Sequence, residues 1–433
     1  MRGRWGGASA LRLSAGTAAL AFACPGLAQD DRRNVLAADA LDLPADRASD
    51  LAAIAQPATT LDEVQPTLTS DDTPAKDPFD LDIVVSQFTD IPVAGDADST
   101  LRYGGRVDGF FSYNATSNFK INLRPEYVWG ESSNGAVGLI PTNSALFRSE
   151  GNGDFDLSAS LQYTWDSGAT LEVGKMNLFD TSLTIPILES NGHFGFQNLG
   201  IVLPPTGIAP NTITGAMLTV PTEKMLYRAW VFDPDSQFGR TGFETAFESG
   251  IAVLVAAARR INLGGQPGVV NLAFAGSSRT DLTSIIPSVL TPPPDGDFGD
   301  ESGEFAVQLS AYQYLATYPE APGKGWGILA RFQASAGDPT FLDYSGYLGV
   351  AGNPRFRPQD RFGLAYFHYS LTNELVDDIA FRLDIEDEDG IEAFYTWQFD
   401  EGLGLTANLQ VVDSAIRVRD RGVVLGGRLT AAF

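Results

Sequence analysis

The sequence has almost no cysteine and almost no histidine, and both shortages exclude chemistry. Its single cysteine, Cys24, lies in an N-terminal stretch that resembles a leader, so the rest of the chain has no cysteine to form a disulfide. Its two histidines, His193 and His368, do not have zinc-site spacing, and no Gly-x-Ser-x-Gly nucleophile motif occurs. We therefore expect no enzyme activity, no catalytic residue, no metal site and no cofactor.

Long apolar runs and basic residues are also scarce. No run in the sequence approaches the 18 or so apolar residues that a membrane-spanning helix needs. Lys and Arg number 29 against 54 Asp and Glu, which gives a net charge of −25. A chain this acidic repels a phosphate backbone, so nucleic acid is excluded as a partner. What the sequence does have is glycine, at 45 residues, and 11% aromatics, a composition that favours one large β-barrel.

Residues 1–28 have the features of a cleaved signal peptide. Three arginines lie in its first twelve residues, an apolar run covers 13–23, and small residues precede the predicted cleavage site at Ala28. The apolar run is too short to cross a bilayer as a helix. We predict cleavage after Ala28. A lipoprotein signal ending at Cys24 is the alternative, although the residues before the cysteine match that signal poorly.

Residues 29–76 form an acidic segment between the signal peptide and the rest of the chain. Ten acidic residues stand there against four basic ones, and aromatics are few. Such a segment cannot bury enough apolar surface to fold by itself, so we predict a flexible periplasmic stretch. The chain then divides into a signal peptide at 1–28, this acidic segment at 29–76 and a barrel domain at 77–433.

From residue 77 onward, apolar and polar residues alternate. Every second residue from Val423 to Phe433 is apolar or small, with Arg428 and Thr430 between them. In a strand these two sets face opposite sides, and a transmembrane barrel strand needs about ten such residues, apolar toward lipid and polar toward the lumen. Charged residues in mid-strand and aromatics near strand ends favour a membrane barrel over a soluble sandwich. The pattern recurs at 118–129, 155–165, 326–337 and 402–412.

Counting the alternating segments gives an even-numbered barrel. Fifteen segments appear from residue 101 onward, one of them at 378–385, and a segment at 79–91 brings the total to about 16. Residues 338–360 are interpreted as one long connection. Short connections alternate with long ones nearly throughout, as expected for periplasmic turns and outer loops. We predict an all-β, transmembrane antiparallel β-barrel in the outer membrane of a Gram-negative bacterium.

A barrel of this size encloses water unless something narrows it. The longest predicted connection, 178–211, contains His193, Phe194 and Phe196 together with several amides. Aromatic faces and amides suit weak contacts with a carbohydrate, but the same residues could simply pack the loop against the wall. Charged side chains at inward positions could likewise tune the selectivity of the pore or brace its wall in pairs.

Several short stretches are similar to those of carbohydrate-selective porins of the OprB type, in order and in spacing, over roughly residues 79–433. They are Tyr103–Arg106, Gly174–Asp180, Arg357–Gly363, Ile391–Trp397 and Gly426–Phe433. The resemblance implies a sixteen-strand porin that passes monosaccharides such as glucose by facilitated diffusion. It also implies a folded-in loop and charged residues at the constriction. The polar residues that it marks are Arg106, Lys175, Asp180, Arg357, Asp360 and Glu392.

The alternation, the long loop and the resemblance together give one set of candidates for lining the pore or contacting a solute. They are Arg106, Asp108, Lys120, Arg124, Glu126, Glu172, Lys175, Asp180, His193, Phe194, Arg331, Arg357, Asp360, Glu392 and Arg428.

The expected partners follow from this location. They are outer-membrane lipid and lipopolysaccharide, small sugars, and the barrel-assembly machinery, which would recognise the final strand through Phe433. Trimers are common among such pores, but the sequence carries no interface evidence for a homotrimer.

Two other functions stay open at this point. One is a general porin, or a porin for amino or organic acids, without sugar selectivity. The other is an adhesin or structural barrel, whose acidic run at 384–389 could bind divalent cations at the lipopolysaccharide layer. A solvated loop tip is the simpler interpretation of that run.

Overall fold

A computed structural model describes residues 78–146, 155–178, 193–202, 208–280, 303–400 and 402–433. The predicted signal peptide, nearly all of the stretch before the first strand, and Asp180 lie outside these ranges. In the described part of the chain, no helix is both long enough and apolar enough to cross a bilayer.

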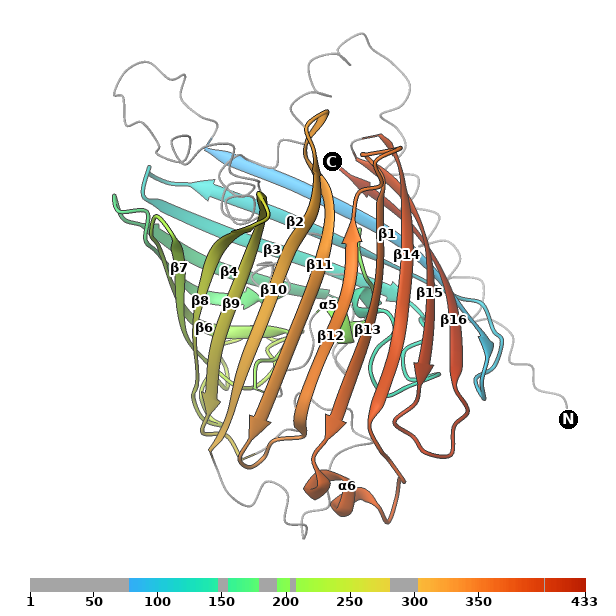
Figure 1. The fold of residues 1–433 in the computed structure, drawn as a ribbon. Coiled ribbons are helices and arrows are strands. Elements are labelled where there is room, and N and C mark those ends of the chain that lie inside the picture. The colour runs from blue at the N-terminus through green and yellow to red at the C-terminus, as the bar shows by residue number, and fades with distance from the viewer. Residues whose placement is uncertain (1–77, 147–154, 179–192, 203–207, 281–302, 401) are drawn as a thin grey trace, which may run out of the picture. The chain divides into compact units, whose positions relative to one another are not determined.

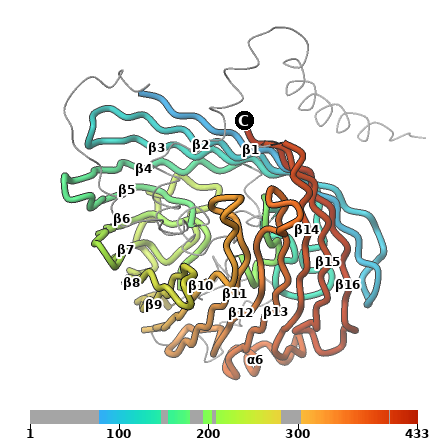
Figure 2. Tube along the Cα trace, turned by 45° about the horizontal axis from the view of Figure 1, so that its top comes forward, coloured from blue at the N-terminus to red at the C-terminus, as the bar shows by residue number. Residues whose placement is uncertain are grey.

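Sixteen antiparallel strands form a closed barrel in which each strand pairs with its neighbours in sequence and the last pairs with the first. Figure 2 shows them as a ring. The predicted fold class and strand count are therefore confirmed. The strands are β1 (Phe79–Ala94), β2 (Arg102–Asn114), β3 (Phe119–Gly130), β4 (Phe155–Thr164), β5 (Thr170–Asn177), β6 (Thr212–Pro221), β7 (Met225–Phe232), β8 (Ala252–Leu263), β9 (Gln266–Ser277), β10 (Glu304–Tyr318), β11 (Ala321–Ala336), β12 (Leu342–Gly352), β13 (Arg361–Leu371), β14 (Glu388–Asp400), β15 (Leu403–Asp413) and β16 (Gly422–Ala432).

The two-residue period of the sequence separates the two faces of the wall. On β16 the side chain of Leu429 is 46% exposed on the outer face, whereas its neighbour Arg428 is 1% exposed on the inner face. The outer face of the other strands carries leucine, valine and aromatic side chains in the same way. This arrangement gives lipid an apolar surface and leaves the polar residues inside.

The two ends of the barrel differ in their connections. Figure 1 shows the C-terminus and the β10–β11 hairpin at one end, and the helix α6 (Asn373–Ile379) at the other. Turns at the C-terminal end are short; the β8–β9 turn consists of Gly264 and Gly265, whose φ angles of 62° and 79° favour glycine. Because barrels of this kind have short periplasmic turns and longer outer loops, the C-terminal end is the periplasmic one.

The prediction went wrong in two places that cancel in the strand count. The segment 378–385 is not a strand; it begins inside α6, where Leu375 and Ile379, four residues apart, are both fully buried. Residues spaced by four lie on one face of a helix, and this pair outweighs the local alternation. The missing strand is β12, which lies within the predicted long connection 338–360 and whose glycines weaken the alternation.

The inner wall is not polar throughout. On β11 to β14 the inward side chains include Leu329, Tyr347, Phe367 and Phe394, all buried in one apolar cluster. The short helix α5 (Leu199–Val202) packs into this cluster from the middle of the barrel. Exposing these apolar side chains to water inside a channel would cost free energy. Because a loop segment buries them, the inner wall can carry them.

Candidate functional site

Residues 193–202 of the longest predicted connection lie inside the barrel. The Glu392 carboxylate on β14 accepts hydrogen bonds from the backbone N–H groups of Gln197, at 2.7 Å, and Asn198, at 2.9 Å. Arg428 on β16 donates to the carbonyl of Gly195 at 3.0 Å. The backbone of this segment, which we call the inner loop, is therefore held directly by the wall.

A second loop, residues 131–146 between β3 and β4, also reaches the inner wall; we call it the covering loop. The carboxylate of Glu388 accepts hydrogen bonds from the backbone N–H groups of Leu139, at 2.6 Å, and Ile140, at 2.9 Å. Two backbone hydrogen bonds join it to the inner loop, Ser144 N–H to Gln197 carbonyl and Leu199 N–H to Pro141 carbonyl, at 2.8 and 2.9 Å. The two loops thus form one layered unit against β14 to β16.

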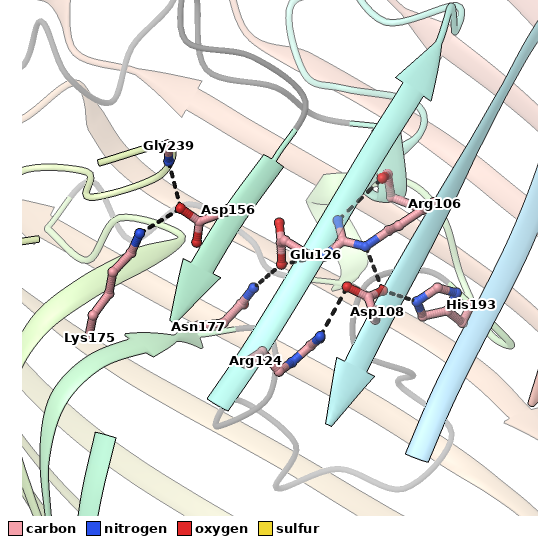
Figure 3. Close-up of polar contacts among 10 residues, drawn as sticks. Arg106, Asp108, Arg124, Glu126, Asp156, Lys175, Asn177, His193 and Gly239 are labelled. Carbon is pink, nitrogen blue, oxygen red and sulfur yellow. Dashed lines mark hydrogen bonds and ion pairs between the residues drawn. The ribbon is translucent and has the colours of Figure 1, made fainter. Parts of the chain in front are cut away.

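A buried ionic cluster connects the inner loop to β2 and β3 (Figure 3). Asp108 accepts hydrogen bonds from Arg106 Nε at 2.7 Å and Arg124 Nη1 at 3.0 Å, and it contacts Nε2 of His193. Glu126 accepts a second bond from Arg106, at 2.7 Å. Two arginines and two carboxylates balance in charge, as buried ions must if they are to remain charged.

Strand register produces this cluster. Asp108 stands directly opposite Glu126 on the neighbouring strand, and each has an arginine two residues earlier on the same face. Each carboxylate therefore has a guanidinium within reach on its own strand or across to the next. His193 joins this cluster to β1, because its Nδ1 lies 2.7 Å from the hydroxyl of Ser86 on that strand.

A third loop, residues 233–251 between β7 and β8, is held by an ion pair on β4 and β5. Lys175 Nζ lies 2.5 Å from Asp156 and also donates to the carbonyl of Arg240 at 2.6 Å, while Gly239 N–H donates to Asp156 at 2.6 Å (Figure 3). Gly174, the residue before Lys175, has a φ of 145°. A Cβ there would stand 2.3 Å from the carbonyl oxygen of Ala159, so only glycine fits.

Other inward residues keep part of their surface exposed. Phe194 is half-buried, and the guanidinium of Arg361 on β13 lies 5.0 Å from the centre of its ring. Lys120 and Glu172 are half-buried on β3 and β5, and Glu172 is within hydrogen-bond reach of the Ser160 hydroxyl. These half-buried side chains provide an aromatic face, cations and a carboxylate inside the barrel.

The structure separates the predicted site residues into groups. It brings Arg106, Asp108, Arg124, Glu126 and His193 together, whereas Arg357 and Asp360 form a 2.9 Å ion pair in the short connection after β12, at the periplasmic rim. Asp180 lies outside the described residues. The buried candidates are Arg106, Asp108, Arg124, Glu126, Lys175, His193, Arg331, Asp360, Glu392 and Arg428; Lys120, Glu172 and Phe194 are half-buried, and Arg357 is exposed.

Sequence reasoning missed three residues that hold the loops: Glu388, Asp156 and Gln410. Gln410 accepts a hydrogen bond from the Asn198 side chain at 3.0 Å and donates to the carbonyl of Thr142 at 2.7 Å. All three occupy inward positions of the alternation, which was the available signal. Glu388 belongs to the acidic run at 384–389, for which a solvated loop tip or a cation site is predicted, but its carboxylate is buried against the covering loop. Among the residues with described positions, no group of three acidic, histidine or cysteine side chains is placed to hold a metal ion.

Comparison with known families decides what kind of barrel this is. The model of the carbohydrate-selective porin OprB family matches residues 130–433. The chain belongs to the OprB family. Comparison with curated proteins gives no match.

Solved structures show the same fold for this OprB-family chain. The high-pH structure of Pseudomonas putida OprB is 15% identical, with a TM-score of 0.68, over 82% of this chain and 94% of that one. The outer-membrane channel DcaP of Acinetobacter baumannii is 12% identical, with a TM-score of 0.50, over 82% of this chain and 97% of that one. At these identities the likeness concerns the fold alone. The family match places the chain among carbohydrate-selective porins of the outer membrane, and the family and the fold point to a channel rather than an enzyme.

Proposed function

We propose that this OprB-family porin passes monosaccharides, such as glucose, by facilitated diffusion past the inner loop. The observation that carries the proposal is the half-buried Phe194, held inside the barrel with Arg361 stacked 5.0 Å from its ring. An aromatic face packs against the C–H surface of a sugar ring, and a guanidinium donates to several hydroxyls at once. The pair therefore offers a pyranose both kinds of contact.

Half-buried Lys120 and Glu172, on β3 and β5, add charges of both signs to the accessible wall. Mixed charges can donate to and accept from hydroxyl groups, and they do not favour ions of one sign. This balance suits a neutral polyol better than an amino acid or an organic acid.

The other charged candidates have a different role in this proposal. Arg106, Asp108, Arg124 and Glu126 are buried and paired, so they have no surface to offer a solute. We assign them to holding the inner loop against β2 and β3. Their effect on permeation is then indirect, through the position of Phe194, which follows His193 in the chain.

Export and assembly complete the proposal. We infer that residues 1–28 are removed as a signal peptide and that residues 29–76 extend into the periplasm. The assembly machinery would recognise β16, which is followed by an exposed Phe433. The apolar outer face would contact lipid and lipopolysaccharide.

The proposal predicts that the pore passes monosaccharides selectively and that Phe194 contributes to this selectivity. We expect liposomes carrying the mature chain to swell faster with monosaccharides than with amino acids of equal size. Phe194→Ala should weaken sugar block of ion conductance about three- to tenfold, because an aromatic contact is worth about 0.5–1.5 kcal/mol. Swelling rates and planar-bilayer conductance measure both effects.

Phe274→Ala is the matched control, since Phe274 is exposed on the outer face of β9 and has no access to the lumen. It should leave sugar block unchanged. Swelling that depends on solute size alone, and is equal in all three proteins, would identify a general porin and reject the sugar assignment.

A further inference from the structure

Strand β14 carries two buried carboxylates that each bind two consecutive backbone N–H groups of a different loop. Glu388 binds Leu139 and Ile140 of the covering loop, and Glu392 binds Gln197 and Asn198 of the inner loop. Glu388 and Glu392 lie four residues apart in one strand, so they project from the same face. Both point into the barrel, where their exposed fraction is close to zero.

Carboxylates are well suited to this task. Neighbouring N–H groups that have left a strand or helix need acceptors when they are buried, and a carboxylate offers two oxygens with charge-assisted bonds. Glu388 also accepts from Ala415 N–H at 3.1 Å, and Glu392 from the Asn408 amide. A neutral glutamine in either place would present an NH₂ group to at least one of these donors.

The two carboxylates act on loops that are themselves joined. Two backbone hydrogen bonds connect the loops, and Gln410 on β15 bonds to both, accepting from Asn198 and donating to Thr142. Movement of either loop away from the wall therefore breaks contacts of the other. Groups that share partners in this way are expected to have non-additive effects when they are substituted.

We propose that Glu388 and Glu392 are positioning residues that set the bore of the pore by clamping both loops as one unit. The inference rests on the chain being an open pore, as proposed above, but not on which solute it prefers. Loss of either clamp lets the loop pair leave the wall, which widens the passage. Loss of the second clamp then adds little.

The test measures bore with probes that are blind to sugar recognition. Single-channel conductance is recorded in the presence of neutral polyethylene glycols of graded size, for Glu388→Gln, Glu392→Gln and the double variant. We expect each single variant to conduct roughly twofold more than the parent, because the loops occupy part of an otherwise wide barrel. Larger polymers should enter the pore, and the double variant should resemble the single ones.

Glu386→Gln is the matched control: it makes the same chemical change in the same stretch, at a side chain that is 45% exposed and paired with Arg417 at 3.4 Å. It should conduct like the parent. Heat-modifiable migration on gels shows whether each variant is a folded barrel. Folded Glu388→Gln and Glu392→Gln pores with parental conductance and polymer cut-off would overturn the clamp, and additive effects in the double variant would overturn the coupling. A sugar-blind pore that still widens would reject only the sugar assignment.

Discussion

Replacing Asp108 with alanine should destabilise the folded barrel by about 3–5 kcal/mol, the usual result of removing one partner from a buried ion pair. The substitution leaves Arg106 and Arg124 inside the barrel without their shared carboxylate, and His193 loses its link to β2. Urea unfolding in detergent, followed by tryptophan fluorescence, measures the change. We also expect noisier single-channel currents, because the inner loop loses one of its attachments.

Two comparisons isolate the cause. Asp108→Asn keeps an acceptor for one of the arginines and should cost less than alanine. Asp166→Ala removes an exposed carboxylate from the β4–β5 turn and should change stability by less than about 0.5 kcal/mol. An unfolding midpoint for Asp108→Ala equal to that of Asp166→Ala would mean that the ionic cluster does not hold the fold.

Replacing Phe367 with alanine should cost about 3–5 kcal/mol, as for a large aromatic removed from a packed core. Phe367 on β13 is fully buried in the apolar cluster that receives α5, and its ring lies 6.0 Å from that of Tyr369. The cavity opens in the same cluster as Leu199, Ile201 and Val202 of the inner loop. Unfolding in urea and proteolysis of the folded barrel, with the inner loop as the expected cleavage site, report the two consequences.

The neighbouring residue supplies the control. Tyr366 is 44% exposed on the outer face of the same strand, so Tyr366→Ala changes a lipid contact and leaves the cluster intact. It should lose much less stability and should not increase cleavage. If the two variants lose equal stability, the inner apolar cluster contributes no more to the stability of the barrel than a contact on its outer face.

How much of this could be predicted from sequence depends on the range of the interaction. The alternation in β16, where Leu429 faces out and Arg428 faces in, is a local property, and it predicted the barrel, the strand faces and the strand count. It failed for β12, whose glycines hide the period, and at α6, where a helical pair of apolar residues interrupts it.

The candidate site was predictable only in part. Parity indicates that a side chain faces inward, but not whether a loop covers it: Lys120 and Arg124 share a face of β3, yet one is half-buried and the other buried. Whether a loop covers an inward side chain is decided by contacts such as that of Glu388 with Leu139, 249 positions away in the chain. No local pattern encodes such a contact. This is why Glu388 was missed and why Glu392, although predicted to face inward, was not predicted to hold a loop.

Closure of the barrel between β1 and β16 also has a consequence for its assembly. Ile83 and Phe433 exchange backbone hydrogen bonds in both directions, so β1 is completed only when β16 pairs with it. Until then β1 has an open edge, whose N–H and C=O groups cannot be left unpaired in lipid. A chain that lacks β16 would therefore not form a slightly narrower channel. It would leave a sheet with open edges on β1 and β15, and each edge could pair with a strand of another protein.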